Sequence, residues 1–97
     1  MFNITQQANH WHVSGDLLMN NASKLLDLSE KLEMSEVTVV DFSAVTDVDT
    51  SALSLMLEWQ RRAEASNCQI SFSNISDNLI SLAELYGVTE FIPTKHA

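Results

Sequence analysis

The sequence contains few of the residues that interrupt regular structure or cross-link a chain. Its 97 residues include 2 glycines, 1 proline and 1 cysteine. Because glycine and proline mark most turns, their scarcity predicts that most of the chain forms helices and strands. The lone cysteine, Cys68, excludes an internal disulfide, and its neighbours Asn67 and Gln69 lack the positive charge that activates a thiol. We therefore expect Cys68 to be a small buried hydrophobe.

Basic residues are scarce as well. The chain has 5 lysines and arginines against 13 aspartates and glutamates, which gives a formal net charge of -8. Clusters of lysine and arginine bind phosphate backbones and anionic lipid headgroups, so this charge argues against nucleic acid and against direct docking on a membrane. It favours a protein partner that carries a basic patch.

Long apolar runs are also missing. No stretch reaches the roughly 20 apolar residues that cross a bilayer. The segment from Met1 to Asn9 lacks the basic and apolar regions of a signal peptide, so we expect a cytoplasmic protein. With 97 residues and 45% hydrophobic content, the chain is expected to form a single domain over residues 1–97 with one core.

Hydrophobic periodicity predicts strands that alternate with helices. Segments in which apolar and polar residues alternate, or in which β-branched residues run together, are typical of strands, whereas apolar residues spaced by three and four are typical of helices. The predicted strands are 2–5, 10–13, 37–42 and 69–73, and the predicted helices are 18–32, 49–65 and the segment from Ser76 to Gly87. This order favours right-handed crossovers between parallel strands, and hence an α/β fold with helices mainly on one sheet face.

Several boundaries and orientations follow from the same pattern. Gly15 and Asp16 are expected to end the second strand, and residues 43–48 to form a loop. The buried stripe of the first helix is expected to include Leu28, and that of the third helix Tyr86.

Other side chains have more than one interpretation. Trp59 is either a core residue or an exposed interface residue. Arg61 and Arg62 are expected to be solvated at the end of the second helix, where they favour its dipole. His10 and His12 share one strand face, as metal ligands sometimes do, but no cysteine or acidic residue joins them at a suitable local spacing. We expect solvent-facing histidines and no metal.

The start of the predicted second helix carries carboxyl and hydroxyl side chains. Asp49 and Thr50 are both good N-cap residues, because a side-chain oxygen can accept a hydrogen bond from the free backbone N–H groups there. If Asp49 is the cap, Val48 and Leu53 occupy the positions of a hydrophobic staple. Capping alone can explain these residue types, so by themselves they do not establish a functional site.

The segment from Val40 to Leu53 resembles the signature of STAS domains. That family includes anti-sigma-factor antagonists and the STAS subunit of the Mla phospholipid-transport ABC system. Its pattern is a strand, Asp-Leu-Ser, a short loop, and Asp-Ser-Ser-Gly-Leu or Asp-Thr-Gly-Gly-Leu at the start of a helix. The matching residues here are Asp41, Ser43, Asp49, Thr50 or Ser51, and Leu53. The order of elements agrees over nearly the whole chain, and the resemblance implies a STAS-type mixed four- to five-stranded sheet.

Two further segments resemble the transporter branch of the family. Residues 53–63 contain leucines followed by Arg-Arg-Ala, and residues 82–88 end in Leu-Tyr-Gly-Val. The resemblance therefore implies a subunit without enzyme activity or cofactor. Its partner would be the cytoplasmic ATPase of a phospholipid-transport ABC complex, together with the permease. Such a subunit would stabilise or regulate the ATPase, help maintain outer-membrane lipid asymmetry, and reach the inner membrane only through the complex, without inserting into it.

The family hypothesis also assigns the site residues. In the family the turn at the start of this second helix faces the partner. The candidate partner-binding residues are therefore Asp49, Thr50, Ser51 and Ser54.

The alternative is an anti-sigma-factor antagonist switched by phosphorylation, with Ser51 and Thr50 as candidate sites. A phosphate adds about -1.5 to -2 charge, which the helix start favours and which Asp47 and Asp49 oppose. Phospho-switched members usually carry glycine where this chain has Ala52, a departure that weakens this alternative.

Overall fold

The chain alternates between strands and helices largely as the hydrophobic pattern predicts. The computed structural model describes residues 2–92 and 94–95. The elements are β1 (Asn3–Gln7), β2 (His10–Leu17), α1 (Ala22–Ser29), β3 (Val37–Val48), α2 (Thr50–Ala65), β4 (Gln69–Ser73), α3 (Asp77–Leu85), the 3-10 helix η1 (Thr89–Phe91) and β5 (Thr94–Lys95).

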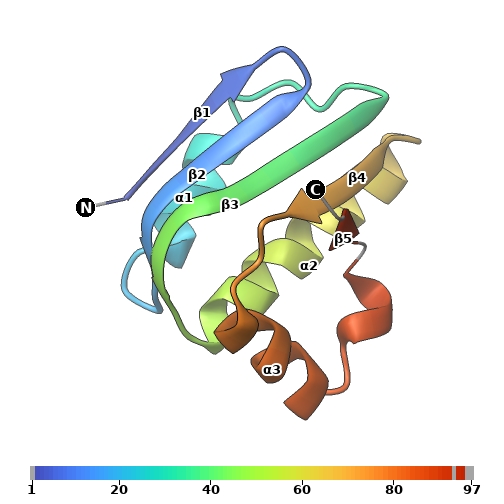
Figure 1. The fold of residues 1–97 in the computed structure, drawn as a ribbon. Helices are drawn as coiled ribbons and strands as arrows, with labels where there is room; N and C mark the ends of the chain where they lie inside the picture. The colour runs from blue at the N-terminus through green and yellow to red at the C-terminus, as the bar shows by residue number, and fades with distance from the viewer. Residues whose placement is uncertain (1, 93, 96–97) are drawn as a thin grey trace.

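The strands of the described residues form a five-stranded sheet in the order β1-β2-β3-β4-β5. β1 and β2 form an antiparallel hairpin, whereas β2 and β3, β3 and β4, and β4 and β5 pair in parallel. Figure 1 shows α1 and α2 behind this twisted sheet and α3 below it. The predicted α/β fold with a mixed sheet is therefore confirmed.

The core lies between the sheet and α2. Trp11 of β2 meets Trp59 of α2 edge-on, with 5.7 Å between ring centroids, and Trp59 stacks on Phe72 of β4 at 6.4 Å. All three side chains are fully buried. Aromatic pairs of this kind contribute about 0.5–1.5 kcal/mol beyond the area that they bury. Trp59 is thus a core residue, which decides between the two interpretations of it.

Two predicted boundaries in the central strands are wrong. β2 continues past Gly15 to Leu17, and residues 43–48 extend β3 instead of forming a loop. The extensions pair with each other as far as Leu17 and Val48, with two register shifts on the way. Most side chains of residues 43–48 are exposed, so backbone pairing maintains this part of the strand without producing an alternating hydrophobic pattern.

The first helix is shorter than predicted, and its buried face differs. α1 spans Ala22–Ser29 instead of 18–32, because Leu18 donates its N–H to the side chain of Asn21 and the chain turns there. Leu28, expected inside, is 37% exposed, whereas Ser29 is fully buried. The Ser29 hydroxyl accepts a hydrogen bond from Nε1 of Trp59 at 2.8 Å and donates to the Leu26 carbonyl, so this buried polar group is satisfied.

We expected Arg62 to be solvated at the end of the second helix, but the structure shows that it is not. Its guanidinium donates to the carbonyls of Ser29 and Leu32 at 2.7 and 2.6 Å. It also lies 5.5 Å from the centroid of the Trp11 ring, within the range of a cation–π contact. Arg62 therefore fastens the end of α1 to α2, while its neighbour Arg61 is exposed as predicted.

The third helix ends as predicted, but two side chains nearby differ from expectation. Ser76 caps α3 by accepting from the Leu79 N–H, and Gly87 follows the helix with a positive φ of 69°. Tyr86, expected in the apolar stripe, lies just after the last residue of α3 and is 59% exposed. Cys68 is partly exposed at the edge of the core instead of being buried inside it.

Candidate partner-binding site

The start of α2 is held by Asp49. This residue has extended backbone, and its Oδ1 accepts the Ser51 N–H at 2.8 Å, so it is the N-cap. Because Asp49 supplies the cap, the hydroxyls of Thr50 and Ser51 are not needed for it. Within the described residues neither hydroxyl has a hydrogen-bond partner, which leaves both available to another molecule.

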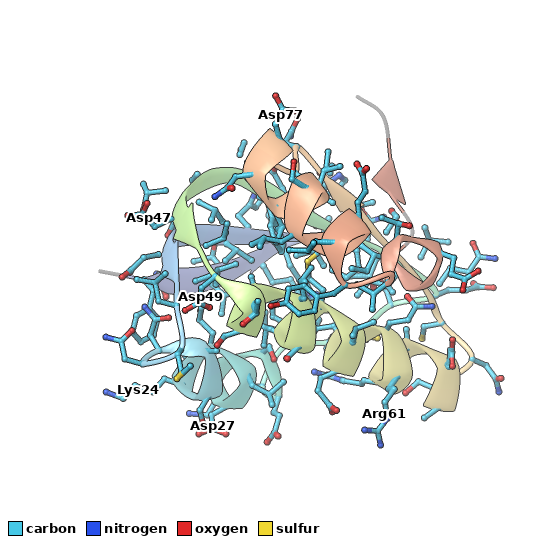
Figure 2. The ribbon with its side chains drawn as sticks, turned by 90° about the horizontal axis from the view of Figure 1, so that it is seen from below. Lys24, Asp27, Asp47, Asp49, Arg61 and Asp77 are labelled. Carbon is cyan, nitrogen blue, oxygen red and sulfur yellow. The ribbon has the colours of Figure 1, made fainter. Side chains whose placement is uncertain are left out.

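The predicted site residues lie on one accessible surface. Thr50 and Ser54, one helical turn apart, are exposed on α2, and Asp49 and Ser51 beside them are partly exposed. Figure 2 shows Asp49 where α2 begins. The structure thus meets the accessibility that partner binding requires; the binding itself remains a prediction.

Asp49 has a second contact that the sequence did not predict. Its Oδ2 accepts the N–H of Met19 at 2.9 Å, and its own N–H donates to the Leu17 carbonyl at 3.2 Å. One carboxylate therefore holds both the start of α2 and the turn between β2 and α1. The sequence could have indicated this contact if β2 and β3 had been extended to their true ends. Their pairing places Leu17 beside Val48, and so brings the turn after Leu17 close to Asp49.

A shallow groove runs between α1 and α2 beside this turn. We call it the α1/α2 groove; it measures about 300 Å³ and is lined by Met19, Ala22, Ser23, Leu26, Ser51, Ser54, Leu55 and Glu58. Two of the predicted partner-binding residues, Ser51 and Ser54, thus share a surface with Met19, which is 77% exposed.

Asp41 and Ser43, the other residues that match the family signature, lie on the sheet away from this turn. The Asp41 carboxylate accepts hydrogen bonds from the backbone and side chain of Ser43 and from the side chain of Asn74. Partial burial raises the pKa of Asp41, but the hydrogen bonds from Asn74, Ser43 and His12 outweigh it and lower the pKa to about 2. This cluster connects β2, β3 and the residue that follows β4.

The two histidines are arranged differently from one another. His10 is exposed, as predicted, and its ring stacks on that of His12 with 6.2 Å between centroids. His12 does not simply face solvent, because its Nδ1 lies 3.3 Å from Oδ2 of Asp41. Over the described ranges, 2–92 and 94–95, no three His, Cys, Asp or Glu side chains gather into a group that could hold a metal ion.

Comparison with known families identifies the class of protein. The model of a family described as "Mlab, STAS domain" matches residues 1–93. The chain therefore belongs to this STAS family, and the resemblance drawn from the signature turn is confirmed. STAS domains are generally regulatory domains without enzyme activity. No curated protein matches the chain significantly.

Solved structures share the fold at low sequence identity. An anti-sigma factor antagonist homologue from Thermotoga maritima has a TM-score of 0.76 at 10% identity and covers 99% of this chain and 86% of its own. The phosphorylated form of SpoIIAA from Bacillus has a TM-score of 0.68 at 14% identity, covering 100% and 91%. A sulfate transporter family protein from Wolinella succinogenes has a TM-score of 0.68 at 18% identity, covering 91% and 76%.

None of the helices in the described part of the chain has both the length and the apolar character needed to span a membrane.

Proposed function

We propose that this chain is a non-enzymatic subunit that binds the cytoplasmic ATPase of an Mla-type phospholipid-transport ABC complex. The surface of Thr50, Ser51 and Ser54 makes the contact, and Asp49 holds it in shape. The chain belongs to the family described as "Mlab, STAS domain", which supports this assignment. The observation that carries it is the pair of hydroxyls, Thr50 and Ser51, at the start of a capped helix, neither of which has a hydrogen-bond partner among residues 2–92 and 94–95.

The physical basis of the contact is preorganisation. Asp49 fixes the first turn of α2 through Ser51 and the turn between β2 and α1 through Met19, so a partner need not order these segments when it binds. Small neutral hydroxyls permit close approach and can donate or accept a hydrogen bond. In this proposal the chain stays in the cytoplasm, reaches the inner membrane through the ATPase and its permease, and supports outer-membrane lipid asymmetry by stabilising or regulating the ATPase.

The proposal is tested by purification of the tagged chain from cells that carry the transporter. The ATPase should co-purify with it, and removal of the chain should change the rate of ATP hydrolysis by the complex. If the ATPase neither co-purifies nor changes its rate, the proposed function is wrong.

The position of the Ser51 hydroxyl also supports the alternative function. The Ser51 hydroxyl has no hydrogen-bond partner in the part of the chain that the structure describes, and it lies at the start of a helix, where the dipole would favour a phosphate. An anti-sigma-factor antagonist switched at Ser51 therefore fits the same geometry. Incubation with the cognate kinase followed by mass spectrometry separates the two functions, because an unmodified Ser51 excludes the second.

A further inference from the structure

Met19 is displayed by an ordered turn. The side chain is 77% exposed, whereas Leu17 and Asn21, each two residues away along the chain, are 0% and 5% exposed. The turn is not frayed, because the N–H groups of Leu18 and Met19 are both hydrogen-bonded at 2.9 Å, to the side chains of Asn21 and Asp49. The fold thus pins the backbone on both sides of a large apolar side chain and leaves that side chain in solvent.

The surface beside Met19 suits an apolar side chain from another molecule. Met19, Leu26 and Leu55 line the α1/α2 groove, and the hydroxyls of Ser51 and Ser54 lie along its α2 side. Arg62 fastens α1 to α2, so the groove has stable walls. A methionine at such a surface can adjust its three rotatable bonds to the shape of a partner.

The charge around the groove indicates what occupies it. Glu58 lines the groove, whereas the nearby Lys24 borders a different depression, on the other flank of α1. Glu58 pairs with Arg61 at 2.8 Å, but both side chains are well exposed, and exposed pairs of this kind are weak. A lysine or arginine of a partner can therefore replace Arg61 as the group that pairs with Glu58. A second copy of this chain would add another net charge of -8, and anionic lipid would be repelled.

We propose that the α1/α2 groove is a second anchor of the partner interface. It receives an aliphatic or aromatic side chain from a basic surface of the partner protein, between Met19 and Leu55, while a lysine or arginine of that surface pairs with Glu58. This inference rests on the proposed function, because it takes the ATPase as the partner, and it adds the specificity of the contact. A few residues dominate the affinity of most protein interfaces, and Met19 is the candidate here.

The test uses isothermal titration calorimetry between the whole chain and the purified ATPase. Met19→Ser should weaken binding about tenfold or more, and Met19→Leu should stay within about threefold of the wild type. The matched control is Leu85→Ser, because Leu85 is also 77% exposed but belongs to α3, on the other side of α2 (Figure 2). The control should bind normally, and all three variants should unfold at the same temperature as the wild type.

A charge reversal tests the second part of the proposal. Glu58→Lys should weaken binding more than Glu58→Gln does, and the loss should shrink as salt is added, because screening weakens exposed charge pairs. Glu84→Lys, an equal change at an exposed position of α3, should have little effect. Equal affinities for Glu58→Lys and Glu84→Lys would overturn the charge assignment.

The outcomes separate this inference from the proposed function. If the wild type does not bind the ATPase, both fail. If the wild type binds and Thr50→Glu does not, while Met19→Ser binds normally, only the groove proposal is overturned. Two other results would also overturn the proposal, because they would assign the groove to another occupant. The first is a dimer of this chain that is lost in Met19→Ser. The second is binding to phosphatidylglycerol vesicles that is lost in the same variant.

Discussion

The carboxylate of Asp49 accepts the backbone N–H of Met19, 30 residues earlier in the chain, at 2.9 Å. The other oxygen of the same carboxylate caps α2 through Ser51 at 2.8 Å. A residue that resembles an ordinary helix cap therefore also fixes the position of the neighbouring turn. Two surfaces are assigned to the partner: the first turn of α2 with Thr50 and Ser51, which we call the hydroxyl turn, and the α1/α2 groove. Both depend on this one side chain.

Substitutions of Asp49 should separate its two roles. Asparagine is as good an N-cap as aspartate, but it replaces one carboxylate oxygen with an NH2 group that cannot accept, so one of the Ser51 and Met19 N–H groups loses its acceptor. Asp49→Asn should therefore change the free energy of unfolding by less than about 1 kcal/mol while hydrogen exchange at the Met19 N–H speeds up. Asp49→Ala should cost about 2 kcal/mol, since the cap is lost as well. Unchanged Met19 exchange in Asp49→Asn would contradict the link between the two turns.

The buried hydrogen bond between Trp59 and Ser29 should stabilise the folded protein. Ser29→Ala leaves the Trp59 Nε1–H buried without its partner, which should cost about 1–3 kcal/mol. Urea denaturation measures this loss. Ser23→Ala in the same helix is the control, because Ser23 is exposed and its removal should change stability by no more than about 0.5 kcal/mol. Similar losses in the two variants would show that the bond contributes nothing.

Neighbouring arginines of α2 should differ sharply when replaced. Arg62→Met removes two hydrogen bonds to backbone carbonyls at the end of α1 and just after it, and should lower the free energy of unfolding by about 2 kcal/mol. Arg62→Lys should recover only part of the lost free energy of unfolding, because an ammonium group lacks the planar fork of donors. Arg61→Met should have almost no effect, since its pair with Glu58 is exposed. Thermal unfolding of the three variants is the measurement, and equal shifts at positions 61 and 62 would be inconsistent with the structure.

The Asp41 cluster predicts a pH dependence. Folding lowers the pKa of Asp41 from 3.8 to about 2, so the carboxylate stabilises the folded state above its unfolded pKa and loses that contribution as the pH falls through about 2. Asp41→Asn should therefore be less stable than the wild type near neutral pH, and the difference should narrow between about pH 4 and about pH 2. A pH series of urea denaturation tests this; a gap between the two proteins that stays constant down to about pH 2 would refute it.

Much of the fold could be predicted from the sequence, because local patterns determine it. The alternation around Trp11 and Val13 places both side chains in the core as predicted, and Ser76 and Gly87 bound the third helix. Asp49 was one of the two predicted caps. These features depend on residues near one another in the chain.

The features that the sequence did not predict depend on contacts between distant residues. The extensions of β2 and β3 are paired through backbone groups, which leave no side-chain pattern. A buried serine at Ser29 looks like a surface residue until Trp59 is placed against it, 30 residues later. The role of Met19 depends in the same way on Asp49. Such contacts become predictable only once the strand register is known.

The central claim is that a partner protein docks on the hydroxyl turn of α2, and titration of the ATPase with two single-residue variants tests it most directly. Thr50→Glu places a charge and extra bulk on this surface and should abolish measurable binding while the unfolding temperature stays close to that of the wild type. Ser81→Glu, the same kind of change at an exposed position of α3, should bind with wild-type affinity. Equal binding by the two folded variants would contradict the account.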